Sequence, residues 1–446
     1  MRTGPGTMHV VGAGLAGLAA AVKLAGEGRD VRLYEAARYA GGRCRSYVDS
    51  ELGCRIDNGN HLLLSGNHRA LGYLGQIGAL GTLEGPRDAI FPFMDAETGR
   101  RWILRPNRGA VPWWVSSAKR RVPETQASDY LTVLGLRRAG KDATVVEALD
   151  REQRLFRCLW GPLAVAALNT SVDCASAGLF WQTLKETLGR GGAACRPLVP
   201  RDGLSETFVD PALARLRAQG VEIRFGARLR SLQFALDRVT ELAFDGGPVE
   251  LSRGDSLILS VPAAVAARLV PALTVPNAYS PIVNAHFRCS VPASLPYFVG
   301  VIGGAAEWIF RKREGLSVTV SAADRFVDQS ADELRGLLWR DAALAYQLPE
   351  HPVPRARIVK ERRATFLASP AQLLRRPPPT TRWKNLLLAG DYVDTGLPAA
   401  IEGAIASGFM AAERARGVGH PPIEMHRRRR APDVPDTGQE RQRALS

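Results

Sequence analysis

The first apolar pattern along the chain is a short β-branched run over residues 8–12, followed by a stretch rich in alanine and leucine up to about Leu24. A short apolar run is typical of a buried strand, and the longer stretch is typical of a helix. The polar, glycine-containing segment 26–30 then predicts a turn, and the apolar residues 31–34 predict a second strand. Together these patterns predict a βαβ unit.

Further patterns downstream resemble the outer parts of the same kind of domain. They predict a helix over 211–219 and strands over 221–225, 229–234, 239–244, 256–260 and 385–389. Between about residues 71 and 198 the pattern is mainly helical, as in 144–149, 155–168 and 175–188. Strand-like runs return over 283–322, a helix follows over 331–346, and the Arg-Pro run 375–379 breaks the chain.

We therefore expect an α/β protein in which a nucleotide-binding domain is assembled from separated pieces around an inserted α+β domain. The first domain is predicted over 8–75, 200–265 and 380–416, and the inserted one over 76–199 and 266–379. Two packed domains also suit a chain of 446 residues. Residues 420–446 are rich in proline, arginine and glutamine, and we expect them to form a disordered basic tail.

Composition excludes several classes of protein. With 46% hydrophobic and 23% charged residues the chain is typical of globular proteins, and no apolar run is long enough to span a membrane. The first seven residues lack the apolar core of a secretory signal, so we expect a cytoplasmic protein. Six scattered cysteines without a C-x-x-C pair suggest neither a metal site nor a redox dithiol. The net charge of +15 implies attraction to anionic surfaces or ligands.

Candidate chemistry begins with Gly12, Gly14 and Gly17, which follow the first strand and open the first helix. In a dinucleotide fold such glycines permit a tight turn, close approach of the backbone to a pyrophosphate, and close packing of helix on strand. Leu15 and Ala16 lie at the helix N-terminus, whose free N–H groups would face the phosphates. Glu35 at the end of the second strand is placed to bind a ribose hydroxyl, which disfavours NADP.

Residues 10–45 then resemble the amine oxidase and phytoene desaturase superfamily of FAD enzymes, because the fingerprint and Glu35-Ala36 are followed by Gly41-Gly42-Arg43. The resemblance implies an FAD-binding Rossmann-type domain of the glutathione-reductase-like kind, with Gly42 and Arg43 against the FAD diphosphate. A guanidinium beside a pyrophosphate is a charge-assisted pair.

Three other segments resemble the same superfamily. Gly390-Asp391 matches its second FAD segment, in which the carboxylate binds the ribityl chain and the next helix N-terminus faces the flavin; Pro398, Ala399 and Ile401 belong to this match. Gly59, Asn60 and His61 match the segment that passes beside the isoalloxazine, and Leu229 matches a position packing near adenine. Asn60 replaces a more common glutamine, and Tyr392-Val393 a more common Trp-Thr.

Within the superfamily, residues 159–170, 360–366 and 395–398 resemble the hydroxysqualene dehydroxylases, also described as squalene-associated FAD-dependent desaturases. The resemblance implies hydride delivery from reduced FAD to a C30 isoprenoid, formation of squalene for hopanoids, and upstream squalene-pathway enzymes as partners. A proton donor must then assist the leaving hydroxyl. The polar candidates are His61, Glu361, Lys360 and Asp57, with His61 ranked first.

Three alternatives stay open at this stage. A carotenoid-type desaturase would use the same flavin oxidatively, whereas a prenyl-protein escort would share the fold without redox chemistry. An amine oxidase is disfavoured because Tyr392 stands alone where an aromatic pair is expected.

One basic, tryptophan-containing region is a candidate for peripheral membrane contact on the inner face of the membrane. The alternative is an ordinary solvated face, and nucleic acid is disfavoured because no nucleic-acid fold accompanies the pattern. The region comprises Arg100, Arg101, Arg105, Arg108, Lys119, Arg120, Arg121, Arg137 and Arg138, interleaved with Trp102, Trp113 and Trp114.

Overall fold

A five-stranded parallel sheet forms the centre of the first domain in the computed structural model, which describes residues 6–415. Its order is β10-β2-β1-β14-β20, so strands from both ends of the chain lie side by side. Every residue of β1, β14 and β20 is buried, which explains their continuous apolar runs. The strands span β1 Met8–Val11, β2 Val31–Glu35, β10 Glu222–Phe225, β14 Ser256–Leu259 and β20 Leu386–Leu388.

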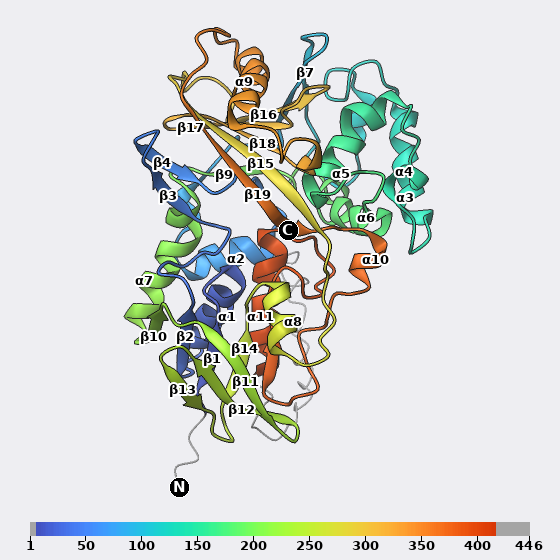
Figure 1. Cartoon of the computed structure of the whole chain (residues 1–446). Helices are drawn as coiled ribbons and strands as arrows, with labels where there is room; N and C mark the ends of the chain where they lie inside the picture. The colour runs from blue at the N-terminus through green and yellow to red at the C-terminus, as the bar shows by residue number, and fades with distance from the viewer. Residues whose placement is uncertain (1–5, 416–446) are drawn as a thin grey trace, which may run out of the picture.

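Helices cover one face of this sheet and a small antiparallel sheet covers the other (Figure 1). Met8, Val10 and Leu387 pack against the helical side. The helices are α1 (Leu15–Gly26), α7 (Asp210–Ala218) and α11 (Ile401–Ala415), with α2 (His68–Gln76) beside α11. The opposite face meets β11 (Leu229–Ala235), β12 (Arg238–Phe244) and β13 (Gly247–Glu250), the first two forming the predicted antiparallel pair.

The second domain is built on a seven-stranded sheet of order β19-β15-β18-β17-β16-β7-β8. One face carries α9 (Ala331–Tyr346), and the other carries aromatic residues that join the helical region 127–186 in one core. The strands span β7 Phe91–Asp95, β8 Arg101–Leu104, β15 Tyr279–Arg288, β16 Phe298–Ile302, β17 Trp308–Lys312, β18 Gly315–Val320 and β19 Ala356–Phe366. The helices of that region include α3 Leu134–Arg138, α4 Val145–Ala148, α5 Gly161–Leu168 and α6 Ala177–Glu186.

The α/β architecture is confirmed, and all strands of each large sheet come from the ranges predicted for its domain, although the domain boundaries stay predictions. The mainly helical pattern expected over 71–198 is wrong in part, because β7 and β8 form there. Their alternating buried residues, Phe91 with Phe93 and Trp102 with Leu104, carry the two-residue period of strands. The predicted tail over 420–446 lies outside the described residues.

The remaining elements are short. They are β3 Ser46–Asp49, β4 Cys54–Asp57, β5 Leu63–Leu64, β6 Leu83–Glu84, β9 Pro197–Pro200, α8 Ala263–Leu269 and α10 Pro370–Leu373, with 3₁₀ or π turns at Leu80–Thr82, Trp113–Ser116, Ala127–Val133, Phe156–Trp160, Leu188–Arg190, Ser205–Val209 and Ala323–Arg325. No helix within residues 6–415 is both long and apolar enough to span a lipid bilayer.

Candidate flavin site

The three fingerprint glycines each meet a different steric demand at the junction of β1 and α1. Gly12 has a φ of +105°, and a Cβ there would lie 2.4 Å from the Ser260 carbonyl oxygen. A Cβ on Gly17 would lie 1.9 Å from the Gly12 carbonyl oxygen, so the helix packs directly on the strand end. Gly14 caps α1 without a side-chain hydrogen bond and has open space around it. The N-terminal N–H groups of α1, including those at Leu15 and Ala16, are therefore accessible to an anion.

The segment after β2 closes over this loop. Glu35 accepts hydrogen bonds from the backbone N–H groups of Ala13 (2.7 Å) and Ala37 (2.8 Å), which flank the loop and Ala36. Gly41 N–H donates to the Ala13 carbonyl at 2.8 Å. A Cβ on Gly42 would lie 3.6 Å from the Cα of Gly14, so the Gly-Gly-Arg segment lies against the fingerprint.

Arg43 and Asp391 meet although they lie near opposite ends of the chain. Their side chains form an ion pair at 2.8 Å, and Arg43 also donates to the Ala364 carbonyl of the inserted sheet. The carboxylate of Asp391 raises the pKa of Arg43. The Arg43 side chain remains 45% exposed, so its guanidinium is open to a ligand as well as paired. This geometry places the two predicted cofactor segments at one cleft.

The Gly390-Asp391 segment is fixed by a residue that sequence reasoning missed. Arg376 is 2% exposed at its side chain and donates to the carbonyls of Val393 (2.6 Å) and Leu397 (2.9 Å). Gly390 N–H donates to Ser407 Oγ of α11 at 2.8 Å. Nothing in the Arg-Pro run around Arg376 distinguishes it from a surface arginine in the sequence.

Helix α11 begins at Ile401, directly after the turn that contains Pro398 and Ala399. A Cβ on Gly408 would lie 2.1 Å from the Ala16 carbonyl oxygen, so α11 and α1 pack backbone to backbone. Both helices follow parallel strands of one sheet, and their N-termini therefore lie at the same edge.

The segment before Leu229 is hydrogen-bonded to the segment after β2, and the adenine position of Leu229 stays a prediction. The N–H groups of Gly226 and Ala227 donate to the carbonyls of Ala37 and Glu35 at 3.0 and 2.9 Å, and Leu229 follows as a buried residue at the start of β11.

These residues fit a flavin dinucleotide. The accessible guanidinium of Arg43 and the uncapped N-terminus of α1 suit a diphosphate, the Glu35 carboxylate suits a ribose, and the open space at Gly14 permits close approach.

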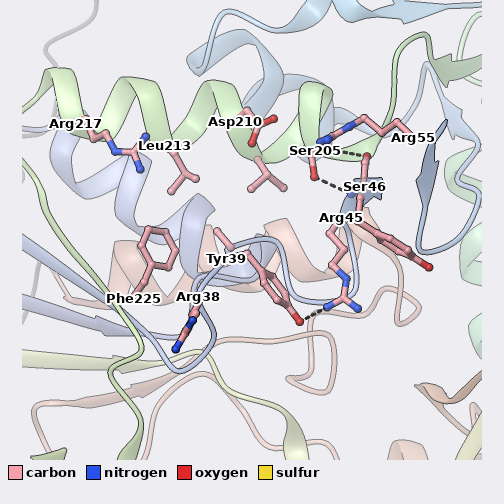
Figure 2. A pocket seen from close by; sticks show the side chains of 13 residues that line it. Arg38, Tyr39, Arg45, Ser46, Arg55, Ser205, Asp210, Leu213, Arg217 and Phe225 are labelled. Carbon is pink, nitrogen blue, oxygen red and sulfur yellow. Dashed lines mark hydrogen bonds between the residues drawn. The ribbon is translucent and has the colours of Figure 1, made fainter. Parts of the chain in front are cut away.

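Ser46, which begins β3 shortly after Arg43, is tied to Ser205 across the chain (Figure 2). Ser46 and Ser205 exchange backbone-to-hydroxyl hydrogen bonds of 2.7 and 2.9 Å, which tie the start of β3 to the segment leading into α7. A surface cavity of about 590 Å³ is lined by residues of the loop before β3 and of the segment that leads into α7. In that cavity Arg45 donates to Tyr39 Oη at 2.6 Å and Arg55 pairs with Glu206, so both arginines have partners.

Asp57 is a structural carboxylate in this geometry. It accepts hydrogen bonds from Ser46 Oγ (2.7 Å), Leu204 N–H (2.9 Å) and Lys312 Nζ (3.0 Å) and is 5% exposed. Burial alone would raise the pKa of Asp57, but Lys312 and the hydrogen bonds lower it below its usual value. The carboxylate is therefore ionised and fully engaged.

His61 is neutral and forms no hydrogen bond with residues 6–415. Burial lowers its pKa to about 4, and the cations Lys312 and Arg43 act in the same direction. A neutral imidazole can donate a hydrogen bond to a ligand but carries no extra proton near pH 7.

Glu361 and Lys360 point to opposite faces of β19. Glu361 pairs in register with Ile282, on the face of Asn284, and its charge acts on Arg43. Lys360 instead donates to the Gln329 carbonyl on the α9 side. The structure brings Glu361 to the cleft and does not bring Lys360 there.

Sequence reasoning missed a polar patch on the cleft-facing side of the inserted sheet. It consists of Asn284 and His286 on β15 and Ser317 and Thr319 on β18, all buried. In the segment 315–320 the two hydroxyl residues alternate with Leu316, Val318 and Val320, and this period could have indicated a polar face.

Comparison with known proteins agrees with this geometry. A family model described as flavin containing amine oxidoreductase matches residues 15–416. The chain is 47% identical to hydroxysqualene dehydroxylase of Rhodopseudomonas palustris over 408 aligned residues. The aligned region covers 91% of this chain and 97% of that protein. It is 44% identical over 407 residues to hydroxysqualene dehydroxylase of Zymomonas mobilis, covering 91% and 98%. A probable zeta-carotene desaturase of Synechococcus elongatus is 24% identical and covers 59% and 60%.

Among solved structures, putrescine oxidase bound to putrescine matches with a TM-score of 0.66 at 15% identity, covering 92% of this chain and 98% of that one. An oxidoreductase from Methanosarcina mazei matches with a TM-score of 0.68 at 14% identity, covering 91% and 100%. These two similarities concern the fold. By its sequence relatives and the family model together, the chain belongs to the flavin containing amine oxidoreductases, as a member of their hydroxysqualene dehydroxylase branch.

Proposed function

We propose that this chain binds FAD and converts hydroxysqualene to squalene by reductive dehydroxylation. The observation that carries the proposal is the meeting of Arg43 and Asp391 beside the fingerprint loop, in a chain that is 47% identical to a hydroxysqualene dehydroxylase. Gly12 and Gly14 would face the diphosphate with Gly42 and Arg43, Gly17 would let α1 pack closely enough to present its N-terminus, and Glu35 and Leu229 would hold the adenosine half. Gly390, Asp391 and the N-terminus of α11 would hold the flavin half.

The flavin, when bound and reduced, supplies the hydride that replaces the hydroxyl group. The remaining tasks fall to the chain: to hold a long apolar substrate, exclude water and deliver a proton to the departing oxygen. The aromatic face of the inserted sheet, with Phe298, Trp308 and Phe310 buried in one core with the helical region, supplies apolar surroundings. Buried polar groups lie at the edge toward Asn60, where Ser317 and Thr319 accept its hydrogen bonds.

For His61 we propose hydrogen-bond donation to the substrate oxygen by a neutral imidazole, since its pKa of about 4 leaves it uncharged. His61→Ala should bind FAD normally but turn over about 100-fold more slowly, in the range that removal of one positioned hydrogen-bond donor to a developing negative charge costs. His61→Gln keeps a donor and should recover part of the rate. Single-turnover kinetics at matched flavin occupancy measure both variants, and an unchanged rate in His61→Ala would remove this residue from the mechanism.

Product analysis tests the function itself. Purified protein reconstituted with FAD and incubated anaerobically with hydroxysqualene and a reductant should yield squalene. Conjugated polyenes formed from squalene or phytoene under oxidising conditions would instead support a carotenoid-type desaturase, which the weaker resemblance to a zeta-carotene desaturase favours. Absence of both products from a flavin-loaded protein would overturn the proposal.

We also propose that the protein contacts anionic membranes peripherally through part of the basic region. Trp102 and Trp114 are core residues, whereas Trp113 is 55% exposed beside Val111 at 76%, and Leu131 is 66% exposed. Arg120 stacks over Trp113 at 4.7 Å. Several basic residues of the region have structural contacts, but Arg108, Lys119, Arg137 and Arg138 are exposed. Cations around exposed apolar groups suit a lipid interface.

Liposome flotation checks this surface. The protein should float with vesicles containing anionic lipid, and Val111→Asp combined with Trp113→Ala should reduce the bound fraction several-fold. Leu236→Asp is the matched control, because Leu236 is fully exposed on the β11–β12 turn in the other domain. Equal flotation of all three proteins, or none with anionic vesicles, would exclude the proposed contact.

A further inference from the structure

A chain of buried hydrogen bonds joins the inserted sheet to segment 57–61. Asn284 Nδ2 donates to the Asn58 carbonyl at 3.5 Å, and Asn284 Oδ1 accepts from the Thr319 hydroxyl at 2.7 Å. Asn60 Nδ2 donates to Thr319 Oγ1 at 2.9 Å and to Ser317 Oγ at 2.7 Å. The side-chain oxygen Oδ1 of Asn60 is buried and has no hydrogen-bond partner among residues 6–415.

The direction of every hydrogen bond in this network follows from the Asn58 backbone carbonyl at its end. A backbone carbonyl can only accept, so Asn284 must turn its Nδ2 toward Asn58 and its Oδ1 toward Thr319. The hydroxyl of Thr319 has one proton and gives it to Asn284. Toward Asn60 it can therefore only accept, and the Asn60 amide cannot be flipped.

The second contact of Asn60 has the same direction. Ser317 Oγ lies 2.8 Å from His286 Nδ1, and burial lowers the pKa of His286 to about 4, so this histidine is neutral. Because Thr319 already fixes Nδ2 on this side of the Asn60 amide, Ser317 Oγ at 2.7 Å from the same nitrogen also accepts. Both protons of the Asn60 amide are thus engaged, and only Oδ1 is free.

An unfilled buried acceptor is destabilising. The network that fixes Asn60 therefore holds an acceptor for a donor that residues 6–415 do not supply. Arg43 donates to the Ala364 carbonyl of β19, and β19 pairs with β15, which carries Asn284. The Asn60 network and the Arg43 contact therefore lie on neighbouring strands of one sheet, which puts this acceptor against the part of the inserted sheet that meets the candidate flavin residues.

We propose that Asn60 Oδ1 accepts the hydrogen bond of the substrate hydroxyl and so determines specificity for an alcohol. This inference rests on the proposed function. With its proton held by Asn60, the hydroxyl oxygen directs its lone pairs toward a proton donor, which suits a departing group. The hydrocarbon product has no O–H donor, so the same acceptor favours alcohol over product.

Equilibrium binding to the oxidised FAD-loaded protein tests this without turnover. Hydroxysqualene and squalene are titrated separately, and binding is followed by the change in flavin absorbance. Wild type should prefer the alcohol, and Asn60→Leu should reduce that preference about 10-fold while binding squalene at least as well. Ser317→Ala keeps Oδ1, and Thr319 still orients the amide, so this control should retain the preference.

The outcomes separate the inference from the function. If wild type binds neither ligand, the proposed function fails. If wild type prefers the alcohol and Asn60→Leu keeps that preference at an unchanged melting temperature, the inference is wrong. A shift of the ligand-free flavin spectrum or reduction potential in Asn60→Leu, with the alcohol preference intact, would assign the acceptor to a flavin N–H and also overturn it.

Discussion

Gly17→Ala is expected to abolish flavin binding, with an affinity loss on the order of 100-fold or more, about 2.7 kcal/mol. The added Cβ would lie 1.9 Å from the Gly12 carbonyl oxygen and close to Ser260 Oγ at 2.5 Å. Neither contact involves a flexible chain end, because Ser260 Oγ itself donates to the Val11 and Gly12 carbonyls. Helix α1 must therefore move away from β1, and the N–H groups that face the diphosphate move with it.

Flavin titration followed by absorbance, together with thermal unfolding, measures this change. The matched control is Gly26→Ala at the other end of α1, where a Cβ meets nothing within 4 Å. That control should bind flavin normally and keep or slightly raise the melting temperature, since alanine favours helix over glycine. Normal flavin affinity in Gly17→Ala would mean that the loop adapts and that the fingerprint does not position the cofactor.

The glycine fingerprint could be predicted from the sequence because the residues that define it are neighbours in the chain. Gly12, Gly14 and Gly17 lie within six residues, and the strand before them and the helix after them have distinct periodicities. The meeting of Arg43 and Asp391 could also be expected, since both follow parallel strands whose carboxyl ends share one edge. Resemblance supplied the rest of the cofactor assignment.

The polar part of the site depends on strand register, which the sequence does not reveal. Whether Glu361 or Lys360 faces the cleft is decided by the pairing of β19 with β15, including the irregularity between Ser280 and Ile282. A one-residue change in register exchanges the two faces. The partners of Asn60 on β18 are equally remote from it in the chain.

Buried charges are the other feature that pattern reasoning misjudged. Asp57 was a catalytic candidate because an acid in a cofactor segment suggests chemistry, but three donors from three segments occupy it. Arg376 was read as part of a chain break, yet it is buried and organises the loop after Asp391. Burial of a charge requires partners that are distant in sequence, so composition alone does not identify it.

Lys312→Met should destabilise the fold by on the order of 3 kcal/mol at neutral pH, because it leaves the buried Asp57 carboxylate without its cation. The value lies at the lower end for a buried pair, since Lys312 is 22% exposed and lines a cavity of about 580 Å³. Lys312 belongs to β17 and Asp57 to β4, so the lost pair also loosens the inserted sheet from the cofactor domain.

The pH dependence of the stability loss in Lys312→Met shows whether the unpaired Asp57 carboxylate causes it. In wild type the lowered pKa of Asp57 stabilises the fold above pH 3.8, the usual pKa of this group, and this contribution is lost as pH falls through the folded-state pKa. Without Lys312, burial raises the pKa of Asp57, so the fold prefers the protonated acid. The difference between variant and wild type should therefore be largest near pH 7 and shrink as the solution becomes acidic enough to protonate the carboxyl.

Denaturant unfolding at pH 7 and pH 4.5 measures both effects. Lys384→Met is the matched control, because Lys384 pairs with Asp237 at the surface with 72% and 44% exposure, and its effect on stability should be much smaller at either pH. Asp57→Asn added to Lys312→Met should restore part of the loss at pH 7, since a neutral amide needs no cation. Equal destabilisation by Lys312→Met and Lys384→Met would show that the interdomain pair contributes no more than a surface contact.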